Sequence, residues 1–290
     1  MGWEQISLKD GDAAVVYICG QSNAHAHGQT LMDAEAINHG CKHVFTLDPR
    51  ISKNLADPSI VWRQYTSQYN NLGEHQDNTC TLGWYIAKTW ETRIAQGERL
   101  PDLYIVQISI GGQGILNGLW NMELPAEADG PLYPLAMHVL PAVEKDLRAR
   151  YQKPIAIGFH WIGSESDTDQ PYSSLPSFRR IYDRFFDSIL AAVGFACPLF
   201  LYKLLFYRNE TACISGIEMV NQIFAAYTQK YAPCYLVDCT RSPLWDASHP
   251  NLGIFAPDNI HYLGRTQRWF GERFLEFLGL CPEQAGQAAQ

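Results

Sequence analysis

The chain has 290 residues, of which 47% are hydrophobic and 18% charged, and its formal net charge is -8. This composition predicts one globular α/β-sized domain over 1–290, with a core from about 13 to 279 and a frayed tail from about 280 to 290. The negative charge, with no basic run, argues against nucleic acid or an anionic membrane as partner. We expect a small-molecule or glycan substrate, and the oligomeric state stays open.

The cysteines and the N-terminal segment bear on the compartment. The eight cysteines show no CxxC or paired metal spacing, and several lie in apolar runs, which favours buried free thiols and a reducing compartment. The first residues contain no basic stretch followed by a long apolar core, and no apolar run reaches transmembrane length. These features predict a cytoplasmic protein, while a secreted form stays open if the natural chain begins earlier.

The first predicted element is an apolar run over residues 13–19, followed by Gly20, Gln21, Ser22 and Asn23. Its β-branched and aromatic residues indicate a buried parallel strand. Serine and asparagine favour turns and helix N-caps, so we expect Ser22 on a strand-to-helix turn. Backbone N–H groups that a helix cannot use could there hold the oxyanion of an acyl-transfer reaction. The alternative is that Ser22 only caps a helix.

His25 and His27 follow this turn with a spacing that invites a metal interpretation. Two histidines without a carboxylate or a third ligand nearby make a poor metal site. We therefore expect no metal and no cofactor. As an alternative role, His25 and His27 could line the mouth of a pocket.

The stretch over 40–80 is polar, aromatic and irregular, and it predicts a short strand at 44–47 within a long surface loop. Long loops in compact domains are often functional. Trp62, Tyr65 and Tyr69 offer flat faces on which a sugar ring could stack. The equally weighted alternative is that they cover the edge of the core.

Strands and helices then alternate to the end of the chain, which predicts an α/β fold with a doubly wound, mostly parallel sheet and helices on both faces. Such folds bind ligands beyond the carboxyl ends of their strands. The expected helices are 82–95, 131–149, 175–193, 215–231 and 263–278, and the expected strands are 103–110, 154–161, 198–205 and 234–238.

The strand over 103–110 ends in Gly111, Gly112 and Gln113. Glycines at such a place let backbone N–H groups approach a ligand closely. A plain strand-to-loop turn is the alternative.

Asp258 and His261 stand three residues apart, in a turn before the last predicted helix. At that spacing the carboxylate can hold the imidazole, and a serine nucleophile needs both a base and a group that orients the base. Ser22, His261 and Asp258 fill these three roles. Asp246 and His249 have the same spacing and form a rival pair, and only the helix that follows His261 favours the first pair.

The GQSN after the first strand, the GG after a middle strand and the DxxH before the last helix together resemble the SGNH (GDSL-like) hydrolases. The likeness is greatest to the branch of acetylxylan esterases and sialate O-acetylesterases, and it extends from Val15 to about Phe277. The resemblance implies a flavodoxin-like SGNH fold and a catalytic triad of Ser22, Asp258 and His261. It also implies an oxyanion hole formed by Ser22 and Gly112.

The stretch from Trp161 to Asp167 is similar to the WxQGExD block of that family, but Gly163 replaces its glutamine and Ser164 its glycine. This change puts a side-chain oxyanion donor in doubt, and Gln113 or Asn23 could supply it. The resemblance further suggests Gln21, Trp161 and Glu165 as substrate-binding residues. Glu165 and Asp167 could form an acid/base pair, although a structural role in orienting the loop is preferred.

The activity that the resemblance implies is removal of O-acetyl groups from a carbohydrate by a serine esterase that needs no metal. Two alternatives stay open. One is a non-catalytic carbohydrate-binding relative, and the other is a thioesterase or lipase-like hydrolase on the same fold.

Overall fold

The computed structural model describes residues 8 and 11–280, apart from 33–34, 51–59, 69–70, 74–77, 117, 125–129, 170–174, 206–210 and 250–252. Within this part the chain forms one seven-stranded sheet in the order β3-β2-β4-β1-β5-β6-β7. Only the β2–β3 pair is antiparallel. The strands are β1 (Ala13–Gly20), β2 (Val44–Leu47), β3 (Trp62–Gln64), β4 (Asp102–Ser109), β5 (Pro154–Ile162), β6 (Leu199–Tyr202) and β7 (Cys234–Val237).

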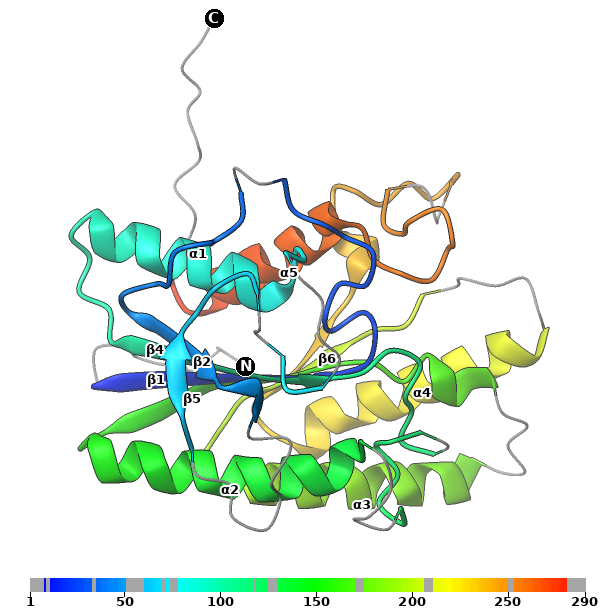
Figure 1. Cartoon of the computed structure of the whole chain (residues 1–290). Helices are drawn as coiled ribbons and strands as arrows, with labels where there is room; N and C mark the ends of the chain where they lie inside the picture. Colours follow the sequence, from blue (N-terminus) through cyan, green and yellow to red (C-terminus); the bar gives the residue numbers. More distant parts are fainter. Residues whose placement is uncertain are drawn as a thin grey trace, which may run out of the picture.

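Five α-helices cover the two faces of this sheet. Figure 1 shows α1 (Leu82–Ala95) and α5 (Gly264–Phe277) on one face, and α2 (Leu132–Arg150), α3 (Leu175–Val193) and α4 (Thr211–Lys230) on the other. The doubly wound α/β fold predicted from the sequence is therefore confirmed. None of the helices in the described part of the chain is long and apolar enough to span a bilayer.

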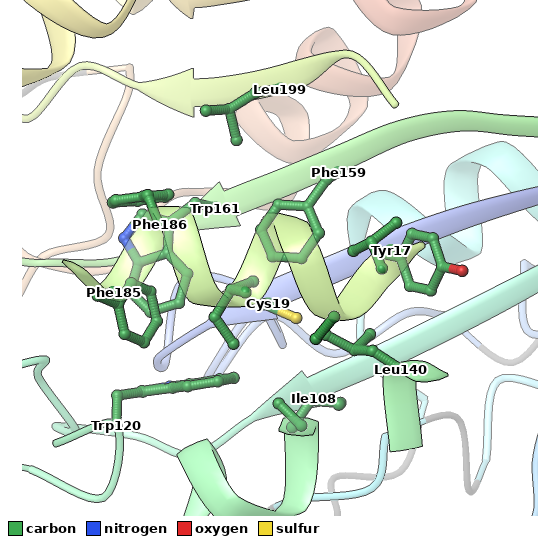
Figure 2. Close-up of a cluster of buried hydrophobic side chains, with 14 of the residues drawn as sticks. Tyr17, Cys19, Ile108, Trp120, Leu140, Phe159, Trp161, Phe185, Phe186 and Leu199 are labelled. Carbon is green, nitrogen blue, oxygen red and sulfur yellow. The ribbon is translucent and has the colours of Figure 1, made fainter. Parts of the chain in front are cut away.

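The central strand β1 packs against helices on both faces, and all eight of its residues are buried. Tyr17 and Cys19 lie in the cluster that α2, α3 and α4 complete, and Figure 2 shows them beside Leu140 and Phe159. The alternate residues Ala14, Val16 and Ile18 lie in the cluster completed by α1 and α5. A strand covered on both faces has no solvent side, so its sequence is apolar at every position rather than alternating.

The expected helices over 82–95 and 175–193 have the observed bounds, and the other ends differ by a few residues. The expected strand over 198–205 is shorter, because β6 ends at Tyr202, and the helix over 215–231 begins earlier, at Thr211. The expected loop over 40–80 contains one strand that the sequence did not predict. That strand, β3, is three residues long and largely exposed, so it carries no apolar pattern.

The aromatic residues of this stretch belong to the edge of the core. The Trp62 ring packs on Tyr104 with centroids 4.6 Å apart, and its Nε1 donates a hydrogen bond to Asp146. Tyr65 is fully buried. These contacts favour the core-edge alternative over a stacking platform for a sugar, and Tyr69 lies outside the described residues.

Gly20, the last residue of β1, lies between the ends of β4 and β5, where it pairs with Ser109 and Ile162. Its φ is +147°, and a Cβ there would lie 2.0 Å from the carbonyl oxygen of Ile162. Its own carbonyl accepts a hydrogen bond from Trp120 Nε1 at 2.8 Å. Because the clash is with backbone, no side chain can be placed at this position without moving β5 away from β1.

We therefore expect Gly20→Ala to lower the free energy of unfolding by at least ~2 kcal/mol more than a matched control. The control is Gly97→Ala, since Gly97 also has positive φ (+94°) but open space around its Cβ position. Left-handed backbone alone costs an alanine ~1–2 kcal/mol. Urea unfolding of both variants measures the difference, and equal losses would contradict the close-approach argument.

Candidate active site

Ser22 stands in a series of turns over residues 22–28, and no α-helix begins within these residues. The expected strand-to-helix turn is therefore wrong. Ala26 and Gly28 have φ of +54° and +71°, which a right-handed helix does not allow. The turns are closed by the N–H of His27, which donates to the carbonyl of Ser22 at 3.0 Å. Ser22, 7% exposed, does not cap an α-helix.

Buried glutamines hold the carbonyl groups of this turn. Gln267 on α5 donates from Nε2 to the carbonyl of Asn23 at 2.7 Å. Gln107 on β4 donates to the carbonyl of Ala24 at 3.5 Å, a longer contact. The turn that carries Ser22 is thus fixed by side chains from a helix and a strand far away in the sequence, in place of helical hydrogen bonds.

Asp258 and His261 form the expected pair. Oδ2 of Asp258 lies 2.7 Å from Nδ1 of His261, while Oδ1 accepts the N–H groups of Ile260 and His261 at 2.9 and 3.0 Å. Partial burial raises the pKa of Asp258, but the hydrogen bonds from His261 and Ile260 outweigh it and the pKa is lowered. An ionised carboxylate only accepts hydrogen bonds, so Nδ1 carries the hydrogen and Nε2 is left able to take a proton.

Asn23 joins the Ser22 turn to the His261 turn. Its Nδ2 donates to the carbonyl of Ile260 at 3.1 Å, and its Oδ1 accepts the N–H of Tyr262 at 2.8 Å. The residue after Ser22 therefore binds the backbone on both sides of His261. Segments from opposite ends of the sequence are in this way brought together at one place.

The same Asn23 amide also donates to Oε1 of Glu165, at 2.7 Å. Both of its hydrogens are then used, so this geometry favours a bracing role for Asn23 over that of an oxyanion donor. Glu165 is 6% exposed. Burial raises the pKa of its carboxyl, and the hydrogen bond from Asn23 opposes that rise only in part. A buried carboxyl held by Asn23 is placed to support the site rather than to contact substrate.

Two other expected substrate-binding residues are buried. Trp161 is 1% exposed, packs against Trp120 and Phe185 in the apolar cluster of Figure 2, and donates from Nε1 to Ser164 Oγ. This placement makes Trp161 part of the core, contrary to the expectation of a substrate contact. Gln21 is 2% exposed and directly precedes Ser22.

The altered block after β5 is built around these side chains. A Cβ on Gly163 would lie 3.1 Å from Cγ of Gln21, so Gln21 fills the space beside it. Ser164 has φ of +89°, a conformation that favours glycine, and its hydroxyl accepts the hydrogen bond from Trp161. The serine found where the family has glycine thus gains a partner for a buried indole N–H at the cost of a strained backbone.

The loop after β4 is held by its own side chains and by Asp167. Gln113 donates to the carbonyl of Gly111 at 3.2 Å and accepts the N–H of Leu119 at 3.0 Å. These bonds favour a loop-bracing role for Gln113 over the expected oxyanion donor. Gly112 is exposed and has φ of +69°, and its N–H stays the expected backbone donor.

Asp167 supports the preferred structural interpretation. Its buried carboxylate accepts the N–H groups of Ile115 and Leu116 at 3.1 and 3.0 Å and the hydroxyl of Tyr182 at 2.7 Å. It therefore ties the loop after β4 to the block after β5, and these contacts disfavour an acid/base pair with Glu165.

A segment that the sequence did not predict lies at the same edge of the sheet. Asn71 bonds to both backbone groups of Ser109 at 2.9 Å, and a Cβ on Gly73 would lie 2.1 Å from the Ser109 carbonyl oxygen. The only signal in the sequence is a glycine two residues after an asparagine, which is common in loops. Its packing against β4 depends on a contact that no local pattern encodes.

The rival pair Asp246–His249 also forms, with Oδ2 3.2 Å from Nδ1, but both side chains are more than half exposed. The pKa of Asp246 is lowered to about 2, first by the hydroxyl of Ser248 and then by its N–H. All of these bonds join Asp246, Ser248 and His249 within one turn, and none of them reaches the Ser22 turn. The geometry favours Asp258–His261 as the pair held beside the Ser22 turn.

His25 and His27 lie with ring centroids 6.0 Å apart, and Nδ1 of His25 is 3.3 Å from Ser109 Oγ. Among the residues that the structure describes, no group of three or more His, Cys, Asp or Glu side chains is arranged to hold a metal. The six cysteines whose side chains the structure describes are free thiols.

Comparison with solved structures places the whole chain in a known fold. The structure of NanS has 17% identity and a TM-score of 0.61, over 94% of this chain and 98% of its own. A protein from Arabidopsis thaliana has 13% identity and a TM-score of 0.60, over 92% and 98%. No family model and no curated protein matches at the level of sequence. These matches show that the chain shares its α/β fold with both structures over nearly its whole length.

The hydrogen bond between Asn23 and Glu165, which we call the brace, can be tested through the Glu165 carboxyl. Because burial raises its pKa, the folded state favours the neutral acid, and stability is lost as pH rises above the ordinary value of 4.5. Glu165→Gln keeps an acceptor for Asn23 without a charge. We expect its stability relative to wild type to increase from pH 4.5 to 8 in urea unfolding. The exposed Glu218→Gln serves as control, and a difference that does not change with pH would argue against the buried acid.

Proposed function

We propose that this protein is a serine ester hydrolase that removes O-acetyl groups from a carbohydrate. The observation that carries the proposal is the pair of Asn23 hydrogen bonds on both sides of His261, which hold an oriented Asp258–His261 pair beside Ser22. A nucleophile, a base and an orienting carboxylate from both ends of the chain thus meet at one edge of the sheet. A fold of this kind carries many functions, so the site and not the fold bears the argument.

In the proposed reaction Ser22 Oγ attacks the ester carbonyl while Nε2 of His261 takes its proton. His261 then gives this proton to the leaving alcohol, and a water molecule activated by the same imidazole releases the acid. Asp258 keeps the hydrogen on Nδ1 and stabilises the imidazolium that forms. The backbone N–H groups of Ser22 and Gly112 are the proposed oxyanion donors.

The carbohydrate part of the proposal has separate support. The motifs at the strand ends resemble those of acetylxylan and sialate O-acetylesterases, and NanS shares the fold over nearly the whole chain. The negative net charge and the polar residues around the site suit a neutral or sugar-like alcohol better than a polyanion.

Ser22→Ala tests the nucleophile. We expect hydrolysis of p-nitrophenyl acetate to fall ~10⁴-fold, because triad members act as one unit. The unfolding midpoint is expected to stay close to wild type, because one small turn residue replaces another. A variant that keeps more than a tenth of wild-type kcat would show that Ser22 is not the nucleophile. Absence of turnover in the wild-type protein would favour a carbohydrate-binding relative.

A comparison of the two histidine pairs tests the base. His261→Ala is expected to be as damaging as Ser22→Ala, and the double variant hardly worse. His249→Ala, which removes an exposed imidazole with the same local geometry, is expected to stay within about twofold of wild type. The reverse order in kcat would move the base to His249.

The acyl group is tested with p-nitrophenyl esters of increasing chain length. For an acetylesterase we expect kcat/KM to fall at least ~10-fold from acetate to octanoate, since longer chains need an apolar channel. A rise along the series would favour the lipase-like or thioesterase alternative.

A further inference from the structure

His27 contacts both halves of the proposed site. Its N–H donates to the carbonyl of Ser22 at 3.0 Å, so its backbone closes the turn that carries the nucleophile. Its ring lies against the ring of His261, with centroids 4.7 Å apart and planes inclined by 42°. One residue therefore links the backbone of Ser22 to the side chain of the base.

The backbone around His27 is unusual on both sides. Ala26, which is 1% exposed, has φ of +54°, and Gly28 has φ of +71°. Left-handed φ is unfavourable for a residue with a Cβ, and such outliers gather at sites where the surrounding structure enforces them. Ala26 is such an outlier, and it directly precedes the residue whose ring contacts the His261 imidazole.

The hydrogen bond from His261 to Asp258 does not by itself fix the orientation of the His261 ring. Asp258 holds the imidazole along its Nδ1 edge, and one hydrogen bond at an edge still allows the plane of the ring to rotate. The side chain of His261 is only 18% exposed, whereas His27 is exposed. His27 therefore covers part of the catalytic ring toward the surface.

We propose that His27 is a positioning residue that fixes the plane of the His261 imidazole by ring contact, so that Nε2 is directed toward Ser22. Its catalytic meaning rests on the serine esterase proposed above, while the ring contact itself does not. The role depends on a flat ring at this place. Asp258 and Glu165 lie near His261, and His25 lies near His27.

Three variants test whether position 27 needs a flat ring, needs a polar group, or needs neither. His27→Ala removes the ring, His27→Phe keeps it, and His249→Ala removes an exposed histidine elsewhere. With p-nitrophenyl acetate we expect His27→Ala to lower kcat ~10-fold with KM within about twofold, because a misplaced base slows only the chemical step. We expect His27→Phe to stay within about threefold of wild type, and His249→Ala to be unaffected.

The proposal is overturned if His27→Ala keeps wild-type kcat, or if His27→Phe is as slow as His27→Ala, which would assign a polar role to the imidazole. Because His27 is exposed, we expect unchanged unfolding midpoints. If His27→Ala unfolds early, His27→Leu, which keeps bulk without a flat ring, takes its place with the same expected loss.

A second readout does not depend on activity. The Cε1–H signal of His261 in a ¹H–¹³C NMR spectrum is expected to shift and broaden in His27→Ala, because the neighbouring ring and its restraint are lost, and to stay sharp in His27→Phe. An unchanged His261 signal in His27→Ala would refute the ring contact. A protein without esterase activity but with these spectral changes would refute the proposed function and keep the positioning role.

Discussion

The candidate site depends on one side chain, the carboxamide of Asn23. It bonds to Ile260, Tyr262 and Glu165, so it connects the segments after β1, after β5 and before α5. Both of its N–H donors and its oxygen are used inside the protein, where an unpaired polar group is costly. Asparagine is suited to this place because it offers donors and an acceptor on one flat group, which neither aspartate nor leucine of similar size can do.

This connection requires that the strand ends approach each other very closely. Gly20 permits β1 and β5 to meet without a side chain between them, and Trp120 then closes over its carbonyl. Asp167 fixes the loop after β4 to the block after β5. The carboxyl edge of the sheet is thus a set of backbone segments held by buried polar side chains, and its precision follows from the rigid sheet beneath it.

The sequence predicted the five helices, six of the seven strands and the residue pair Asp258–His261, because the patterns behind them are local. Apolar runs identify strands, and a carboxylate three residues before a histidine in a turn needs no distant partner. The brace was beyond its reach, since Asn23 and Glu165 are 142 residues apart and Gln267 lies 244 residues from Asn23. The sequence suggested Trp161 as a substrate contact, but alternation along β5 puts it on the same face as Phe159, in the cluster with α3.

The two carboxyl groups near His261 differ in environment, and this difference favours different roles for them in the proposed reaction. Asp258 is about half exposed and accepts several hydrogen bonds, which lower its pKa and keep it ionised, whereas burial raises the pKa of Glu165. An ionised Asp258 can hold Nδ1–H and balance an imidazolium. A second buried charge would bind the imidazolium more tightly and slow the return of its proton to the leaving alcohol. Burial favours the neutral form of Glu165 and so reduces this effect, while Oε1 still accepts the hydrogen bond from Asn23. The Asn23–Glu165 bond can then support the proposed base without favouring a second charge beside it.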